Sequence, residues 1–230
     1  MAAFREAIAA GADGIEFDVR LSKDLVPVII HDGTLRRTAG RADRIANLTW
    51  NELKHVNVGS WFPHGDFKRE TLPCLEELFT LFENNDRSLY LEMKCDSRSE
   101  LEPLAKACCE TIDNFSFKER VIVECFDLRA LEIIRRIDPK IKTAALFEPA
   151  ISKPSVLLDQ RIIDQTIGVQ AAELALHHRL ARSRLVQKAR LAGLRVVVWT
   201  VDDPKWIARA RAIGVEALIT NDPAAMLAHR

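Results

Sequence analysis

The sequence predicts an α/β fold in which parallel strands and their connecting helices are arranged as in a (β/α)₈ barrel. The first observation is a recurring order: a helical stretch ends at a glycine, and a short run rich in β-branched residues follows, as at 205–220. This order is typical of βα units in a parallel sheet. The second observation is length, since 230 residues lie close to the ~250 of a typical barrel. The third is that seven barrel-type strands can be assigned, one fewer than a closed barrel needs.

Each element follows from its local pattern. Helices are expected at residues 1–10, 100–112, 128–137, 153–165, 183–192 and 205–213. Strands are expected at residues 15–19, 88–94, 121–126, 141–147, within 168–176, 195–201 and 215–220. A glycine directly after a helix, such as Gly11 or Gly214, supplies the left-handed residue that ends it. The run 26–30 follows 19–21 after a connection too short for a crossover helix, which predicts an antiparallel hairpin inserted into the barrel.

The first helix lacks the start that the other helices have. Residues 1–3 offer no Ser, Thr, Asp or Asn as a cap, whereas Asp127 and Asp203 are candidate caps for later helices. Together with the strand count, this predicts that a first strand and the start of its helix are absent. The chain is therefore expected to be one barrel domain, residues 1–230, that is incomplete at its N-terminus.

Composition and charge argue against nucleic acid and membrane as partners. Lys plus Arg and Asp plus Glu number 33 each, so the chain lacks the basic surplus of a nucleic-acid binder. The longest apolar runs, such as 26–30 and 196–199, are far shorter than the ~20 residues that span a bilayer, so no stable membrane insertion is expected. Five cysteines without a CxxC pair predict reduced thiols in a cytoplasmic protein.

Two carboxylates, Glu16 and Asp18, lie two residues apart on an otherwise apolar strand. They share one face of that strand, because side chains alternate along it. Two carboxylates inside a barrel repel each other unless a positive charge lies between them. Oxygen ligands of this kind suit a hard divalent cation such as Mg²⁺ or Ca²⁺. The alternative is a polar edge strand with both acids in water.

A third acid, Glu92, shares one face of the strand at 88–94 with Lys94. Two interpretations fit this spacing. The two side chains form a surface ion pair of little energetic weight, or they are a metal ligand beside a phosphate-binding cation. The apolar neighbours on the strand favour burial, and the spacing alone leaves both interpretations open.

His31, followed by Asp32, ends the return strand of the hairpin. Imidazole titrates near neutral pH, so a histidine at this position can move protons during the cleavage of a phosphodiester. The alternative is an ordinary histidine in an exposed loop.

These pieces fall into one ordered pattern that covers essentially the whole chain. Its most specific part is the N-terminal third, where residues 11–19 (GADGIEFDV), 22–24 (SKD) and 27–32 (PVIIHD) follow one another. The pattern continues through residues 35–38 (LRRT), 48–53 (LTWNEL), 59–62 (GSWF), 72–77 (LPCLEE), 91–94 (LEMK), 125–127 (CFD), 198–202 (VWTVD) and 214–223 (GVEALITNDP). In these motifs and their order the sequence closely resembles the glycerophosphodiester phosphodiesterase family.

The resemblance implies a fold and an activity. The fold is a TIM-type (β/α)₈ barrel of the phospholipase C-like phosphodiesterase kind, with the active site at the C-terminal ends of its strands. The activity is hydrolysis of glycerophosphodiesters to an alcohol and sn-glycerol 3-phosphate, a step of lipid and glycerol metabolism that a divalent cation (Mg²⁺ or Ca²⁺) assists.

The resemblance also assigns roles to residues by motif. The matched metal ligands are Glu16, Asp18 and Glu92. One of two catalytic histidines is matched by His31. The matched substrate-binding residues are Lys94, which faces the phosphate, and the aromatic residues Trp199 and Phe126. For Phe126, packing in the barrel core is an alternative.

The chain departs from the family at its start. The family opens with a strand that ends His-Arg-Gly, followed by a Pro-Glu-Asn-Thr stretch, and neither has a match here. In the family that His is the other acid–base catalyst and that Arg grips the phosphate. No other histidine takes the place by motif. His177 and His178 follow a predicted strand, and the simplest interpretation is that they are loop histidines.

Two hypotheses from different classes follow. One is a glycerophosphodiester phosphodiesterase acting on a small-molecule substrate. The other is a catalytically impaired or non-catalytic barrel that binds metal and phosphodiester, because the first catalytic His and Arg are missing. A barrel freed from catalysis has no reason to keep so many inward polar groups, which favours the enzyme. A phospholipase-type barrel acting on lipid phosphodiesters is a weaker alternative, since no membrane-docking segment is visible.

Overall fold

Eight strands form one mixed sheet in the computed structural model, which describes residues 1–63, 65, 67–149 and 159–230. The strand order is β2-β1-β3-β4-β5-β6-β7-β8. All neighbours pair in parallel except β1 and β2, which form an antiparallel hairpin. The strands are β1 (Gly14–Leu21), β2 (Pro27–Ile29), β3 (Ser88–Met93), β4 (Val121–Cys125), β5 (Lys142–Phe147), β6 (Glu173–His177), β7 (Arg195–Trp199) and β8 (Ala217–Leu218).

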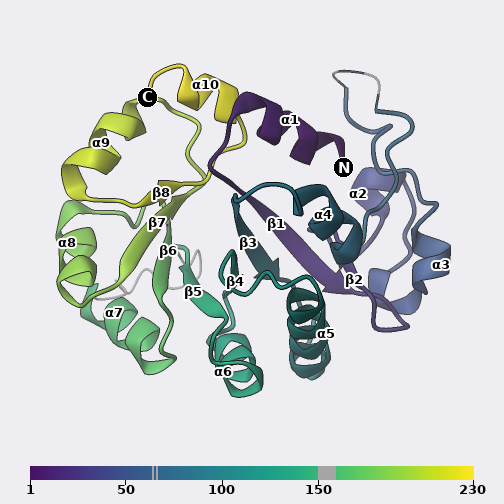
Figure 1. Ribbon diagram of the computed structural model, residues 1–230, viewed down its shortest axis with the longest axis horizontal. Helices are drawn as coiled ribbons and strands as arrows, with labels where there is room; N and C mark the ends of the chain where they lie inside the picture. The colour runs from purple at the N-terminus through teal and green to yellow at the C-terminus, as the bar shows by residue number, and fades with distance from the viewer. Residues whose placement is uncertain (64, 66, 150–158) are drawn as a thin grey trace.

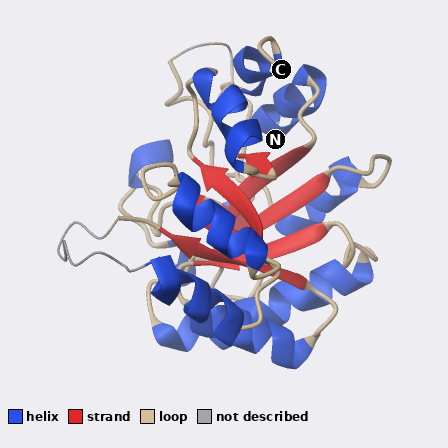
Figure 2. Ribbon diagram, turned by 90° about the vertical axis from the view of Figure 1, so that its left-hand side faces the viewer, coloured by secondary structure: helices blue, strands red, loops and turns tan. Residues whose placement is uncertain are grey.

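Helices surround the curled sheet on its outer side (Figure 1, Figure 2). Those that connect or flank the parallel strands are α1 (Ala2–Ala10), α4 (Leu75–Phe82), α5 (Leu101–Asn114), α6 (Leu128–Ile137), α7 (Asp159–Gly168), α8 (Ser183–Leu191), α9 (Lys205–Ile213) and α10 (Pro223–Leu227). Short helical turns lie elsewhere, at α2 (Arg36–Ala39), η1 (Ile45–Asn47), α3 (Trp50–Leu53) and η2 (Arg98–Glu100).

The glycine and aspartate residues predicted to end or start helices do so in the structure. Gly11 ends α1 with φ 85, a left-handed conformation that a side chain would strain. Asp127 accepts a hydrogen bond from the backbone N–H of Arg129 at the start of α6, and Asp203 accepts one from Lys205 at the start of α9. The predicted hairpin is confirmed.

The helices and strands predicted from the sequence are found near their predicted bounds, and β6 provides the strand expected within 168–176. Two differences are that β8 is limited to Ala217–Leu218, within the strand predicted at 215–220, and that α2, α3 and α4 were not predicted. Of the helix predicted at 153–165, residues 153–158 lie outside the described part of the chain.

Apolar side chains form three separate clusters. The largest packs the helices onto the outer face of the sheet, and Leu91 and Leu131 belong to it. A second fills the inside of the curl, with the members Tyr90, Ile122, Ala144, Leu146, Ala175 and Val197. The third lies mostly in the segment between β2 and α4, residues 30–74, which we call the excursion. Its members are Val28, Ile30, Leu35, Ile45, Leu53, Val56 and Leu72. The excursion therefore has a core of its own.

The sheet curls without closing in the described part of the chain, so the structure is an incomplete barrel. In the described residues β8 pairs with β7 but not with β1, and the pairing between β2 and β1 covers only residues 19–21 of β1. The first half of β1 and the outer edge of β8 consequently face each other, with no strand from the described residues between them. Backbone groups on such edges are free to pair with a further strand.

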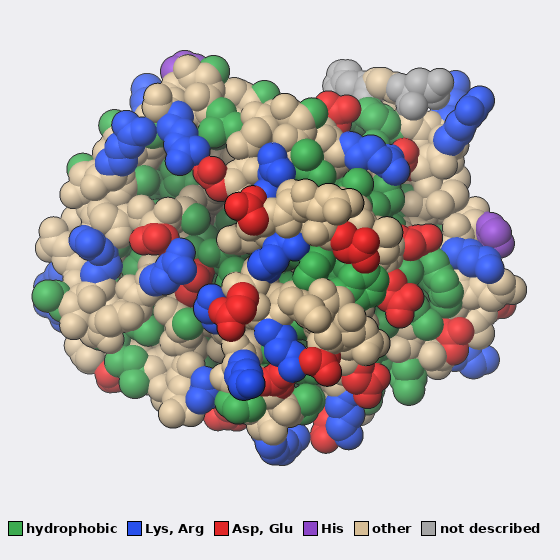
Figure 3. Space-filling model, viewed as in Figure 1, with side chains coloured by type: hydrophobic (Ala, Val, Ile, Leu, Met, Phe, Trp, Pro, Cys, Tyr) green, Lys and Arg blue, Asp and Glu red, His purple; other side chains and the backbone are tan. Residues whose placement is uncertain are grey.

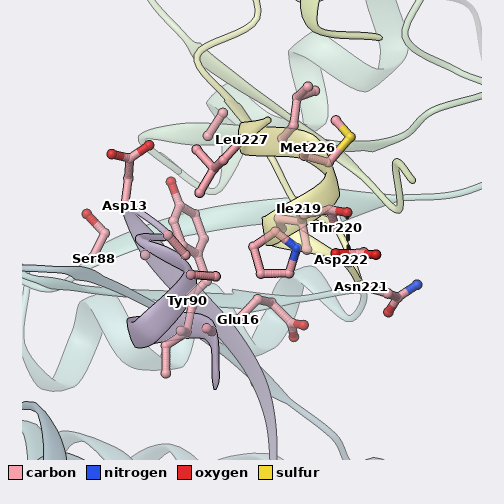
Figure 4. Close-up of a pocket in the computed structure, with 18 of the residues that line it drawn as sticks. Asp13, Glu16, Ser88, Tyr90, Ile219, Thr220, Asn221, Asp222, Met226 and Leu227 are labelled. Carbon is pink, nitrogen blue, oxygen red and sulfur yellow. Dashed lines mark hydrogen bonds between the residues drawn. The ribbon is translucent and has the colours of Figure 1, made fainter. Parts of the chain in front are cut away.

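A cavity of about 1290 Å³ lies at this opening, and we call it the β1–β8 groove. Its walls come mainly from the two terminal parts of the chain together with Tyr90 of β3; Figure 4 shows Glu16 and Tyr90 with Ile219 and Leu227. α1 borders the groove and has no buried residue. The prediction of seven parallel strands is thus confirmed, whereas a closed barrel is not formed by the described residues.

Candidate metal and phosphodiester site

Three carboxylates converge where β1 and β3 lie side by side. Asp18 and Glu92 are register partners in this parallel pair, and Glu16 lies two residues before Asp18 on the same face. One carboxylate oxygen from each of the three residues lies within 4.8 Å of the others. Glu92 is buried, and the two acids of β1 are only partly exposed. The alternative of a polar edge strand with both acids in water therefore does not hold.

Lys94 lies directly after β3 and neutralises part of this charge. Its Nζ is 2.5 Å from Oε1 of Glu92 and 3.3 Å from Oδ1 of Asp18. The lysine side chain keeps only 17% of its surface exposed, so the pair is not a loosely solvated surface ion pair. One ammonium group among three carboxylates leaves the cluster short of positive charge.

Burial raises the pKa values of two carboxyl groups in the cluster. Desolvation, reinforced by the charges of Asp18 and Glu92, raises the pKa of Glu16 from 4.5 to about 8. Desolvation also raises the pKa of Glu92, against the opposing effect of Lys94. The raised pKa values show that the cluster carries too little positive charge to keep all its carboxylates ionised. Its ligand atoms are all carboxylate oxygens, which suit a hard divalent cation.

Cation binding at this cluster should release a proton. Because Glu16 must be ionised to bind a metal, the affinity for Mg²⁺ or Ca²⁺ should rise by about tenfold per pH unit from pH 6 until it levels off near the pKa of Glu16. The metal-free protein should show the opposite trend in stability. Its raised pKa means that the folded state binds the extra proton, so the free energy of unfolding falls as pH rises between about 4.5 and 8.

Titration calorimetry at pH 7, in two buffers that differ in ionisation enthalpy, measures the protons released per cation. Thermal melts of the chelator-treated protein across the same pH range check the stability trend. Binding that releases no proton and does not change with pH would contradict this prediction.

His31 follows β2 and points away from the core, with 59% of its side chain exposed. Its Nδ1 lies 2.8 Å from Oδ1 of Asp32, and Nε of Arg37 donates to Oδ2 of the same aspartate at 2.7 Å. The Arg37 hydrogen bond, followed by that of His31, lowers the pKa of Asp32. An ionised carboxylate accepts hydrogen bonds only, so Nδ1 of His31 donates and Nε2 remains available for proton transfer.

Aromatic side chains form a wall at the ends of β4, β6 and β7. The rings of Phe126 and Trp199 meet edge to face at 5.6 Å, and His177 meets Trp199 in the same way at 5.1 Å. Nζ of Lys94 lies 5.6 Å from the centre of the Phe126 ring, which joins this wall to the carboxylate cluster. Phe126 is 39% exposed, which disfavours core packing as its role. The indole Nε1 of Trp199 is buried without a hydrogen-bond partner among the described residues.

Two further residues lie near the proposed site: Glu124, which was not singled out from the sequence, and His177, which was interpreted as a loop histidine. Glu124 on β4 is 1% exposed, is the register partner of Glu92, and keeps Oε2 without a hydrogen-bond partner in the described part of the chain. Its burial raises its pKa well above the ordinary value. His177, interpreted as a loop histidine, is the last residue of β6 and packs against Trp199. The sequence signal for Glu124 was its position among apolar residues in the strand predicted at 121–126, and the signal for His177 was its position directly after a predicted strand.

Comparison with known proteins places this geometry in a family. The model of the glycerophosphoryl diester phosphodiesterase family matches residues 1–225. The chain belongs to this family. A glycerophosphodiester phosphodiesterase from Caldanaerobacter subterraneus subsp. tengcongensis is 30% identical over 228 residues, which cover 99% of this chain and 89% of the relative. A glycerophosphodiester phosphodiesterase from Bacillus altitudinis is 28% identical and covers 97% of this chain and 88% of its own length.

Solved structures of family members share the fold. A phosphodiesterase from Oleispira antarctica, in complex with the product sn-glycerol-3-phosphate, superposes with a TM-score of 0.87 at 26% identity, covering 99% of this chain and 89% of that one. The glycerophosphodiester phosphodiesterase of Thermotoga maritima superposes with a TM-score of 0.76 at 24% identity, covering 99% and 89%. The family resemblance read from the sequence motifs is thereby confirmed.

Surface features agree with the balanced composition. None of the helices in the described ranges is both long enough and apolar enough to cross a membrane. On the face shown in Figure 3, acidic and basic side chains are interspersed rather than gathered into one patch of a single sign. All five cysteines are free thiols, as predicted.

Proposed function

We propose that this chain performs the metal-dependent hydrolysis of glycerophosphodiesters to an alcohol and sn-glycerol 3-phosphate. The observation that carries the proposal is the convergence of Glu16, Asp18 and Glu92 within 4.8 Å, beside the ammonium group of Lys94. Membership of the family and the product complex of the Oleispira antarctica relative support the substrate class.

The metal would be held by Glu16, Asp18 and Glu92. A divalent cation bound there supplies positive charge that stabilises the charge developing on the phosphoryl oxygens. Glu16 gives up its proton as the cation binds. Lys94 stays close to Asp18 and Glu92 and presents a second positive charge on the side that faces Phe126.

His31 is the proposed proton-transfer residue. Hydrolysis adds water across the P–O bond of the ester, so one proton leaves the nucleophile and one reaches the alcohol oxygen. Asp32 holds the Nδ1–H of His31, which orients Nε2 for one of these two transfers. Phe126 and Trp199 form the apolar side of the pocket.

The direct test follows the release of sn-glycerol 3-phosphate from glycerophosphodiesters with different alcohols. Release should require Mg²⁺ or Ca²⁺ and should stop when a chelator is added. Hydrolysis that continues unchanged in excess chelator would contradict the assigned metal role. A set of alcohols also identifies the head group that the enzyme prefers.

One observation favours a second candidate, a barrel that binds metal and phosphodiester with impaired catalysis. The β1–β8 groove lies directly beside Glu16, so the wall of the site is incomplete on that side in the described residues. Tight cation and sn-glycerol 3-phosphate binding without measurable hydrolysis would identify this second function.

A further inference from the structure

Arg20, a charged residue outside the family motifs, lies two residues after Asp18 on β1. Arg20 is on the same face of β1 as Asp18 and has only 13% of its side chain exposed. Its Nε donates a hydrogen bond to the backbone carbonyl of His31 at 2.8 Å. Its Nη1 donates to Oδ1 of Asp96 at 2.9 Å. The planar guanidinium can make both bonds at once because its donors point in fixed directions.

Asp96 is the second anchor of this arrangement. It lies two residues after Lys94, at the C-terminal end of β3, and its backbone N–H donates to Glu100 at 2.8 Å. Its second carboxylate oxygen accepts from Nη2 of Arg44, a residue of the excursion, at 2.6 Å. The carboxylate thus joins an arginine of β1 to an arginine of the excursion.

The turn after His31 packs directly against this carboxylate. A Cβ atom placed on Gly33 would come within 2.6 Å of Oδ2 of Asp96, so only glycine allows the approach without a shift. The backbone carbonyl of Gly33 also accepts from the N–H of Ile45 at 3.0 Å, which ties the turn to the core of the excursion.

Through Arg20 and Asp96, these contacts connect the main chain of His31 to the segment that follows β3, directly after Glu92 and Lys94. The imidazole itself is exposed and is held at Nδ1 by Asp32, its own neighbour in the chain. The distance from its Nε2 to the phosphodiester therefore depends on where the backbone at residue 31 is held. The contact to Arg20 holds that position from the side of the carboxylate cluster, next to the hydrogen bond that the N–H of Ile30 donates to the carbonyl of Asp18 at 3.0 Å.

We propose that Arg20, through Asp96 and with the support of Arg44, is a positioning residue that holds His31 at working distance from the carboxylates of β1 and β3. The proposal rests on the proposed function, in which His31 transfers a proton. Because misplacement of a reacting group by about 1 Å can cost about 10²-fold in rate, loss of this contact should affect catalysis more than binding.

The test is a double-mutant cycle between Arg20→Lys and His31→Ala. Lysine keeps the charge and can replace one of the two hydrogen bonds, which preserves folding better than an apolar residue. Arg20→Lys should lower kcat by about 10- to 100-fold, with KM and Ca²⁺ affinity changed less than about twofold. In the His31→Ala background the same substitution should change kcat less than about twofold, because the group it positions is gone.

Two further variants sharpen the result. Asp96→Asn keeps the shape of the side chain and removes its charge. If Arg20 and Asp96 position His31 together, this variant should lower kcat as much as Arg20→Lys does. Arg41→Lys is the matched control, since Arg41 lies in the same excursion and pairs with Asp43 at the surface, 2.9 Å away. This control should leave kcat, KM and the melting temperature unchanged.

The outcomes separate this proposal from the proposed function. An equal loss of kcat from Arg20→Lys with and without His31 would overturn the positioning role and leave the function in place. A wild-type rate for Arg20→Lys would overturn it as well. A wild-type rate for His31→Ala would remove the proton-transfer assignment of His31, and the positioning proposal with it.

Discussion

Replacing Glu16 with Gln should abolish tight binding of Mg²⁺ or Ca²⁺ and lower the release of sn-glycerol 3-phosphate by about 10²- to 10³-fold. Gln keeps the size of the side chain but cannot supply the charge that a hard cation requires. The magnitude follows from the several kcal/mol by which a bound cation stabilises the developing charge, at about 1.4 kcal/mol per factor of ten. Calorimetry measures the binding, and product release measures the rate.

The metal-free melting temperature separates this effect from a folding defect. Burial and the neighbouring carboxylates make an ionised Glu16 unfavourable, so Glu16→Gln should not lower the melting temperature of the chelator-treated protein. The matched control is Glu173→Gln, a buried acid on β6 that accepts a hydrogen bond from Tyr90 at 2.9 Å and lies outside the cluster. Gln can still accept from the Tyr90 hydroxyl, so cation binding should persist. Parental cation affinity in Glu16→Gln would show that the metal lies elsewhere.

Extending the chain before Met1 by one strand and its connection to α1 should raise product release by at least about 100-fold, since a positioned acid or base contributes about 10²- to 10⁴-fold. Right-handed crossovers place each parallel strand beyond the previous one on the same side. Because β3 lies on one side of β1, a strand before α1 belongs on the other side, in the β1–β8 groove. The family motif indicates that such a strand ends His-Arg-Gly.

Two matched extensions identify the cause of any gain. An extension of equal length with proline at alternate strand positions cannot pair with β1 and β8, and it should leave the melting temperature unchanged. An extension that keeps the strand but replaces its His with Ala should raise the melting temperature without restoring the rate. Equal rates for the extended and unextended forms would refute the prediction and direct attention to His177 or His178 as the second proton-transfer group.

The carboxylate cluster could be predicted from a local rule for its two acids on β1 and from the family resemblance for Glu92. Alternation along a strand places Glu16 with Asp18, and adjacent parallel strands present their C-terminal ends at one edge, where Glu92 lies. Glu124 was not predicted, because an acid inside an apolar strand gives no sign of which strands flank it. Its burial follows from register with Glu92, which only the folded sheet defines.

Contacts between distant segments account for what the sequence did not show. The pairing of Arg20 with Asp96 spans 76 residues, and neither residue belongs to a recognisable motif. The short helices α2 and α3 were also missed, since a helix of four residues is stabilised by packing rather than by periodicity. Their side chains Leu53 and Ala39 pack in or against the core of the excursion. α4 was not predicted as a helix, although its buried residues Leu75, Leu78, Phe79 and Phe82 recur at helical spacing.

The β1–β8 groove is bordered by α1, which precedes β1, and by α10, which follows β8. The C-terminal residue also contacts the connection between α1 and β1, since Arg230 pairs with Asp13 at 2.9 Å. By the same right-handed rule, a strand placed after α10 would lie beside β8, in the position that a strand before α1 would take beside β1. A circular permutation that moves this strand from one terminus to the other would leave all its neighbours in the sheet the same. Between β1 and β8, the same spatial order of strands can therefore be built with the additional strand at either terminus.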